Sequence, residues 1–435
     1  MKKLYLLFII FLICKGAVLA QKSFSYEKEF FQIEKKYEKG KYKKALRKLK
    51  SKEKSSDKTI QTFAYLYKAK IYEAQGLMQD MEASLNQAVQ NAEILQASSP
   101  QNYATYLVKL AELYEIYGSP AKSLSIIEAS SNQALVAQAP PVSKAEWLFL
   151  QGKSNLSAGN FAQSEVLFDK ALKHYDSLLS DTKINRLERE TIKKQKARLL
   201  TQKALVYTQK GEYEKADSLL QAYKKPVRQL TSVVDMAYIE HLIAFAQNRE
   251  AQEQYRTANQ YYKMGQRANE YYDFAFSKNS KGYFHLQEGI VRNNIRSMNN
   301  IFGYGLSLMK LKKETKRYFP KNSIYDAYIV LLEVEHLMQK RNYPKALNKI
   351  SNLLSNDSKI YLPKDHKVRA KATKYLAQLY TKTPSITNQQ VEKTYQDWLS
   401  IEADRYSQHS FYYQISELEL ANYYVVESEN FLEGK

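Results

Sequence analysis

Residues 204–220 read ALVYTQKGEYEKADSLL, and this stretch decides the fold class. A small residue, Ala204, is followed three places later by Tyr207 and then by a turn at Gly211. Beyond the turn, Ala216 continues the apolar pattern at helical spacing. Glycine suits the left-handed conformation that ends a helix, so the stretch predicts two helices joined by a tight turn.

The same pattern recurs along the chain. Six further copies combine small residues, aromatics and a turn, and are marked by Gly40-Lys41-Tyr42 and Ala45; Ala69, Tyr72 and Gly76; Ala111, Tyr114 and Gly118; Gly152 and Gly159-Asn160-Phe161; Ala246, Tyr255 and Ala258; Tyr343, Ala346 and Ile350. A single copy is a weak signal. Seven copies in one chain predict units that stack into a solenoid.

These residues resemble the tetratricopeptide repeat (TPR), whose paired helices approach closely at small residues and wedge aromatics into neighbouring holes. The resemblance covers most of residues 25–356. It implies an all-α fold, a TPR-like right-handed superhelix of helix-turn-helix repeats with a helical C-terminal cap. It also implies that the first helix of each pair lines a concave groove that binds other macromolecules.

The turns are spaced more widely than the roughly 34 residues of the standard repeat. They fall at Gly40, Gly76, Gly118, Gly159, Gly211, Glu253 and Arg341. The last interval is about twice the one before it, which predicts a unit without motif residues near 267–316. We therefore expect a cleaved signal peptide at 1–20 and TPR-like repeats at 21–266. An irregular helical unit should follow at 267–318, where the superhelix bends or divides. Further TPR-like repeats with C-terminal capping helices should occupy 319–435.

The first twenty residues indicate export. Lys2 and Lys3 precede an apolar run that reaches Cys14, and small residues at 18 and 20 form a cleavage site before Gln21. The apolar run is short for a membrane span. We expect a location in the periplasm or at the cell surface. An outer-membrane lipoprotein with a lipidated Cys14 is the less favoured alternative, because the large Ile13 precedes the cysteine.

Charge is unevenly distributed in a chain whose formal net charge is +21. Residues Lys35–Lys58 hold twelve basic side chains against three acidic ones, whereas the stretch from Thr387 onward holds nine acidic side chains and three basic ones. The basic run is either a solvated helix face or a contact with an anionic membrane surface, lipopolysaccharide or an acidic partner. Nucleic acid would also be attracted, but export disfavours it as a partner.

The residues predicted to bind a partner lie on the first helix of each pair. They are Phe63, Lys70, Phe149, Lys153, Arg198, Thr201, Tyr328 and Glu335. This mixed apolar and charged lining suits an extended peptide or a partner helix. It does not reproduce the Lys/Asn/Lys/Arg clamp with which some TPR proteins hold a C-terminal carboxylate. Its apolar members also fit an inward-facing core strip.

Motifs for catalysis or cofactor binding are missing from the sequence. The six histidines never occur at the i, i+3 or i+4 spacing that would place two imidazoles on one helix face. There is no Gly-x-Ser-x-Gly elbow and no phosphate-cradling loop that ends in Lys-Ser or Lys-Thr. We expect no enzyme, no cofactor and no metal site. The tyrosine doublets, such as Tyr261-Tyr262, fit either packing or recognition.

The sequence thus predicts a non-catalytic protein–protein interaction scaffold or adaptor in the envelope of a Gram-negative bacterium, which binds a peptide or an envelope protein in the solenoid groove. Two alternatives stay open. One is a glycan-binding component of a carbohydrate-uptake system, which would need a lipidated N-terminus. The other is the sensory part of an envelope signalling system.

Overall fold

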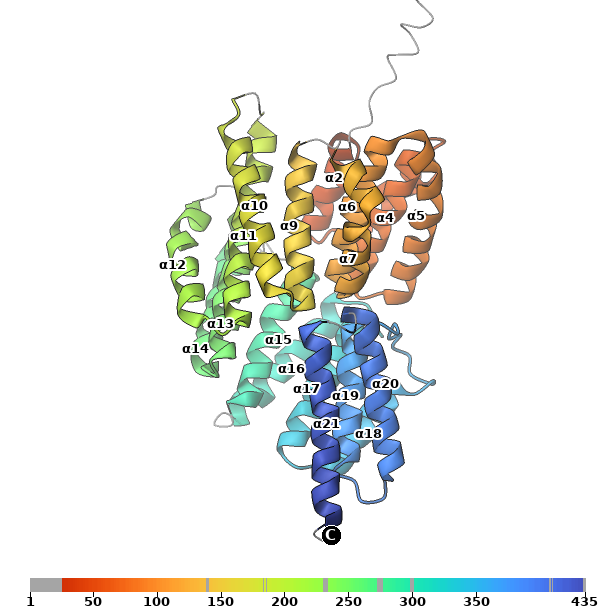
Figure 1. Ribbon diagram of the computed structural model, residues 1–435, viewed down its shortest axis with the longest axis vertical. Helices are drawn as coiled ribbons and strands as arrows, with labels where there is room; N and C mark the ends of the chain where they lie inside the picture. The colour runs from red at the N-terminus through yellow and green to blue at the C-terminus, as the bar shows by residue number, and fades with distance from the viewer. Residues whose placement is uncertain are drawn as a thin grey trace, which may run out of the picture.

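The computed structural model of the chain is built from helices arranged in two layers (Figure 1). It describes residues 26–137, 141–182, 184, 186–229, 234–271, 277–297, 301–406, 408 and 410–432. Within these ranges every regular element is a helix, so the all-α prediction is confirmed. The predicted signal peptide at 1–20 and Cys14 lie outside the described residues.

The helices pair into successive hairpins, here called units. Units 1 to 6 are α2 (Tyr26–Glu38) with α3 (Tyr42–Glu53), α4 (Lys58–Gln75) with α5 (Met78–Ser98), α6 (Pro100–Tyr117) with α7 (Pro120–Glu128) and the short α8 (Ser130–Val136), α9 (Pro141–Ala158) with α10 (Phe161–Ser180), α11 (Arg186–Gln209) with α12 (Tyr213–Gln229), and α13 (Val234–Ala251) with α14 (Tyr255–Tyr271). Units 7 to 9 are α15 (Lys281–Arg296) with α16 (Ile301–Tyr318), α17 (Ile324–Gln339) with α18 (Tyr343–Leu354), and α19 (Lys367–Tyr380) with α20 (Asn388–Tyr406). The last helix, α21 (Phe411–Leu432), stands as the first helix of unit 10.

The turns inside the units have the backbone conformation that the sequence predicts. All seven predicted turn positions have a positive φ, from 55° at Arg341 to 94° at Gly118. Small residues sit where paired helices meet: a Cβ added to Gly152 would stand 2.6 Å from the Phe168 ring. The Ser164 hydroxyl donates to the Gly152 carbonyl at 2.7 Å, so a polar contact joins the same two helices.

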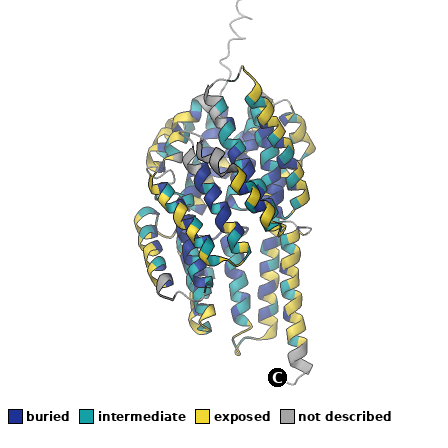
Figure 2. Cartoon of the chain, turned by 90° about the vertical axis from the view of Figure 1, so that its left-hand side faces the viewer, coloured by how far each residue is buried: buried dark blue, intermediate teal, exposed yellow. Residues whose placement is uncertain are grey.

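The units stack so that first helices follow one another along the inside of the curve. Contacts join α4 to α6, α6 to α9, α9 to α11, α11 to α13, α15 to α17 and α17 to α19. Buried residues concentrate between the helices, and exposed residues lie on the outer faces (Figure 2). The solenoid therefore has an inner wall made by first helices.

The solenoid winds back under its own beginning, which the sequence did not predict. The turn of unit 1, at Gly40, meets Ser277 and Asn279 just before α15, and the turn of unit 2, at Gly76, meets Tyr325 at the start of α17. In the same way the turn of unit 3 meets Lys367 at the start of α19, and the turn of unit 4 meets Phe411 at the start of α21. Each of units 1 to 4 thus rests on the unit six places later, and the lower layer in Figure 1 is the second turn of the solenoid.

Hydrogen bonds join the two turns of the solenoid. The Ile324 amide donates to the Gly76 carbonyl at 3.0 Å, and the Tyr325 hydroxyl donates to the Ala74 carbonyl at 2.8 Å. One unit further on, Asp365 accepts from the Tyr117 hydroxyl at 2.8 Å and pairs with Lys122 at 2.6 Å. These contacts bring together residues about 250 positions apart in sequence.

The segment predicted as an irregular unit, 267–318, contains the end of α14 and the hairpin of α15 and α16. It is the point at which the second turn begins, because the chain just before α15 is the first part to meet unit 1. The boundaries predicted at 266 and 318 stay a prediction. Among the described residues, no helix combines the length and the apolar character that crossing a membrane requires.

Candidate functional site: the inner wall of the solenoid

Polar side chains on the first helices form bridges between neighbouring units. Lys70 on α4 donates to Glu112 on α6 at 3.3 Å, and Ser157 on α9 donates to Glu115 on α6 at 2.5 Å. Arg198 on α11 binds Glu240 on α13 through two hydrogen bonds, both 2.9 Å long. In each of these pairs the residues are 42 positions apart. The bridges therefore join equivalent positions of successive units.

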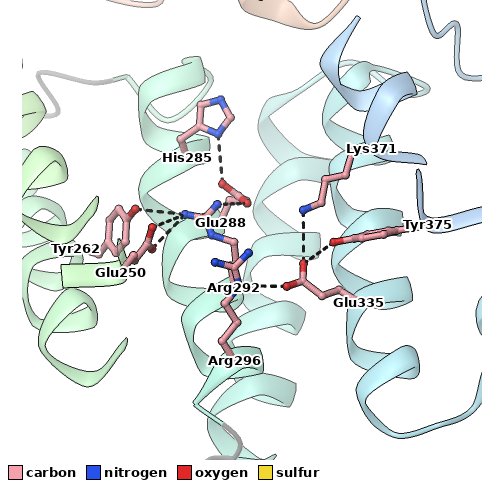
Figure 3. A network of polar contacts seen from close by, with 9 residues as sticks. All are labelled: Glu250, Tyr262, His285, Glu288, Arg292, Arg296, Glu335, Lys371 and Tyr375. Carbon is pink, nitrogen blue, oxygen red and sulfur yellow. Dashed lines mark hydrogen bonds and ion pairs between the residues drawn. The ribbon is translucent and has the colours of Figure 1, made fainter. Parts of the chain in front are cut away.

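The bridges continue into a longer network around α15 (Figure 3). Arg292 donates to Glu288 on its own helix at 2.6 Å and to Glu250 on α13 at 3.1 and 3.2 Å. One turn further along α15, Arg296 donates to Glu335 on α17 at 3.3 Å. Glu335 also accepts from the Tyr375 hydroxyl on α19, at 3.0 Å. The network thus spans four consecutive units.

Electrostatics keeps these carboxylates ionised. Burial alone would raise the pKa of Glu112, but Lys70, Lys109 and Lys153 outweigh it and lower the pKa to about 2. For Glu335, burial is likewise outweighed by Lys371 and Arg296, so the pKa lies below its ordinary value. A carboxylate that stays ionised between several cations adds negative charge and hydrogen-bond acceptors to the inner wall. It is a poor general base at neutral pH.

The pKa of Tyr37 responds to charges from several units. Burial raises the pKa of Tyr37 in unit 1 well above its ordinary value, and the charges of Glu73 and Glu112 add to the rise. Arg198 in unit 5 acts in the opposite direction on the same hydroxyl.

The eight predicted binding residues all lie on first helices, namely α4, α9, α11 and α17. Lys70, Arg198 and Glu335 are members of the bridges described above. Lys153 stands near enough to Glu112 to lower its pKa. Tyr328 faces Lys367 on α19, whose ammonium lies 5.8 Å from the centre of the Tyr328 ring.

The other predicted residues pack within the chain. Phe63 is fully buried, with its ring centre 6.2 Å from that of Phe30 and 6.3 Å from that of Tyr106. The hydroxyl of the buried Thr201 bonds to the Ala197 carbonyl at 3.1 Å and to His241 Nδ1 at 3.2 Å. Phe149, which is half-buried, packs against the core. In this conformation Phe63 and Thr201 hold helices together and offer no surface to a partner.

Several members of the inner wall were not among the predicted residues. They are Glu240, Glu250, Glu288 and Arg292. A sequence signal for them exists: polar or oppositely charged residues recur 42 positions apart, at the interval between equivalent positions of neighbouring units. A search for complementary pairs at the repeat spacing would have found all of them except Glu288, whose partner Arg292 is on the same helix.

The wall offers polar contacts. In the ranges that the structure describes, no group of three or more His, Cys, Asp or Glu side chains is placed to hold a metal ion. His285 lies 3.5 Å from Glu288, and burial is the main cause of its lowered pKa, so this imidazole is neutral at neutral pH. The ion pairs and hydrogen bonds of the wall are contacts of the kind used in recognition by charge and hydrogen bonding.

Comparison with known proteins is limited to structure. No family model matches the sequence, and no curated protein matches it. Among solved structures, the chain is similar to aspartyl phosphate phosphatase F from Bacillus subtilis, with 13% identity, a TM-score of 0.46, and coverage of 88% of this chain and 96% of that chain. It is also similar to Ton1535 from Thermococcus onnurineus NA1 (13% identity, TM-score 0.28, 87% and 98% covered) and to the TPR domain of P58(IPK) (11% identity, TM-score 0.23, 82% and 99% covered).

These similarities are too weak to assign an activity, and the fold class rests on the helix packing described above. Helix-turn-helix units, positive-φ turns and stacked first helices define an all-α, TPR-like helical-repeat solenoid.

The Glu112 bridge predicts a specific acid sensitivity. Because the folded-state pKa is about 2 and the ordinary value is 4.5, the stabilisation from ionised Glu112 is complete above pH 4.5 and is lost as the pH falls toward 2. The Glu112→Gln variant should be less stable than the parent chain at pH 7, and this difference should shrink steadily below pH 4.5. Thermal unfolding of both chains at a series of pH values measures this difference in stability. A difference that is constant with pH would contradict the assignment.

Proposed function

We propose that this protein is a non-catalytic scaffold or adaptor of the bacterial cell envelope, which binds an extended peptide or a segment of a partner protein along the inner wall. The observation that supports the proposal is the set of charged bridges spaced at the repeat interval. A bound segment can replace these intramolecular contacts one unit at a time, and its own charges then decide the alignment.

The inner face of units 2 to 4 favours a partner with acidic side chains. Three lysines, Lys70, Lys109 and Lys153, act on Glu112, while Glu146 pairs with Lys109 at 3.4 Å. Within the described part of the chain Lys153 makes no direct ion pair with a carboxylate. Its ammonium can therefore pair with an incoming carboxylate without breaking an ion pair within the described part of the chain.

In-cell crosslinking followed by identification of the linked proteins tests the proposal. The Lys153→Glu variant should reduce the recovery of the linked partner at least about tenfold, because an attraction becomes a repulsion in a partly desolvated site. Lys170→Glu is the matched control: it makes the same charge change on the outer helix α10, where the side chain is exposed, and should leave recovery unchanged. Equal recovery with both variants, or no partner above background, would refute binding at the inner wall.

The envelope location rests on the signal-peptide pattern of residues 1–20 and on the predicted contact of Lys35–Lys58 with an anionic surface. In the structure most of these basic side chains point into solvent. Mass spectrometry of the mature N-terminus separates the proposal from its alternative. A chain that begins at Gln21 supports the exported scaffold, whereas a diacylated Cys14 would favour the glycan-uptake lipoprotein.

A further inference from the structure

A buried histidine lies in the contact between unit 3 and unit 9. His366 is 3% exposed and is the residue that precedes α19. Its ring meets that of Tyr117, at the end of α6, edge to face, with the ring centres 5.2 Å apart. The Tyr117 hydroxyl in turn donates to Asp365, the residue before His366. The histidine is therefore part of the contact through which the two turns of the solenoid meet.

One hydrogen bond fixes the protonation state of this ring. The Val368 amide, in the first turn of α19, donates to His366 Nδ1 at 3.2 Å. An amide N–H can only donate, so Nδ1 must present its lone pair and the proton of the ring must be on Nε2. A protonated imidazolium carries an N–H on both nitrogens and would oppose one donor with another. Only a neutral His366 can therefore cap the start of α19.

The charges around His366 oppose its protonation. Lys281 on α15 and Arg405 on α20 act on the ring through their positive charges, and so does Lys367, the next residue in the chain. Burial is the largest cause, and these three cations follow it, in lowering the pKa of His366 well below its ordinary value of 6.5. In the closed contact the ring therefore stays neutral in mild acid.

Nearby carboxylates do not offset these cations. They are already bound by other groups: Asp365 by Tyr117, Ser119 and Lys122, Glu73 by Lys281, and Glu402 by Arg405. Among the residues that the structure describes, none of these carboxylates forms an ion pair with His366. His285, by contrast, lies 3.5 Å from Glu288, which favours its protonated form. The two histidines therefore respond differently to acid.

We propose that His366 is a pH-sensitive latch: the neutral ring holds unit 9 against unit 3, and a proton that only the opened contact can bind releases it in mild acid. In water an exposed histidine takes up its proton near a pH of about 6.5. The latch is fully effective above this pH, where the ring is neutral in both states. Below it, the ratio of closed to open contacts falls about tenfold with each pH unit. The latch uses none of the predicted partner-binding residues, so its test does not depend on the proposed scaffold function.

Hydrogen exchange of the full chain, followed by mass spectrometry, tests the latch. Protection is compared at a pH of about 7.5 and of about 5.5, after correction for the intrinsic pH dependence of amide exchange. Peptides that contain Tyr117 or Val368 should lose protection about tenfold at the lower pH, because the contact opens more often. Peptides from α5, a helix of unit 2, should keep their protection.

Two variants remove the titration and keep the cap. In His366→Asn the side-chain oxygen accepts from the Val368 amide at either pH. In His366→Asp a carboxylate does so, and the three surrounding cations attract it. Both variants should show equal protection at the two pH values, whatever its absolute level. His285→Asn is the matched control: it removes another imidazole whose pKa is lowered by burial, and it should lose protection as the parent chain does.

Three results would overturn the proposal. In the first, the protection of the Tyr117 and Val368 peptides does not change with pH in the parent chain. In the second, the loss persists in the His366 variants or disappears in His285→Asn. In the third, α5 loses as much protection as the contact, which would mean that acid destabilises the whole chain and that no latch acts at this place.

Discussion

Gly76→Ala should destabilise the chain by about 3 kcal/mol, and Gly211→Ala by only about 1 kcal/mol. The two glycines have nearly the same backbone, with φ of 73° and 76°, so the strain of placing alanine there is the same. The two positions differ in the side chains that a new Cβ would meet. A Cβ on Gly76 would stand 2.9 Å from the ring of the buried Tyr325, whereas a Cβ on Gly211 meets nothing within 4 Å.

The difference between the two variants therefore measures the contact between the turns of the solenoid. Denaturant unfolding followed by far-UV circular dichroism gives both values on the same chain. Gly118→Ala is a further control, because its Cβ would reach only the flexible Lys367 side chain at an ordinary 3.5 Å. If Gly76 and Gly211 prove equally sensitive, the second turn does not rest on the first in solution.

Glu402→Leu should cost about 3–5 kcal/mol, because it leaves a buried guanidinium without its carboxylate. The Arg405 side chain is 7% exposed and donates to Glu402 at 2.6 Å. Glu402 also accepts from the Trp398 indole at 3.1 Å. Arg405 in turn reaches across to unit 3, where it donates to the Gly118 carbonyl at 3.4 Å. The ion pair thus stands at the junction of the two turns.

The double variant Glu402→Leu with Arg405→Met should recover most of the lost stability, since it removes both charges and leaves apolar volume in their place. A double-mutant cycle measures this effect. It compares the thermal unfolding of the parent chain, the two single variants and the double variant. A double variant as unstable as the sum of the two single ones would mean that the two residues act independently and that the buried pair is not formed.

The turns of the solenoid were predictable because their signal is local. A glycine at Gly40 or Gly211 between two apolar helical patterns specifies a helix end whatever the rest of the chain does. Even Glu253 and Arg341, which are not glycines, adopt the positive φ that their place in the repeat predicts. The assignment of first helices followed from the same local pattern.

The contact between turns could not be predicted in this way. Asp365 meets Tyr117 and Lys122, and Tyr325 meets Ala74, only because six units bring the chain back to its start. No interval in the sequence marks that closure. Periodicity also could not tell core from surface on a first helix: Phe63 and Lys70 lie two turns apart on α4, yet one is buried and the other reaches the inner wall.

Winding back under its own beginning makes the number of repeats a fixed property of this protein. Most solenoids gain or lose a repeat during evolution at little cost, because each repeat touches only its neighbours. Here the deletion or duplication of unit 5 or unit 6 would shift every junction between the turns by one place, so that Gly76 would no longer meet Tyr325 and Tyr117 would no longer meet Asp365. Homologous chains should therefore vary in loop length and in composition while conserving the count of units between residues 40 and 411.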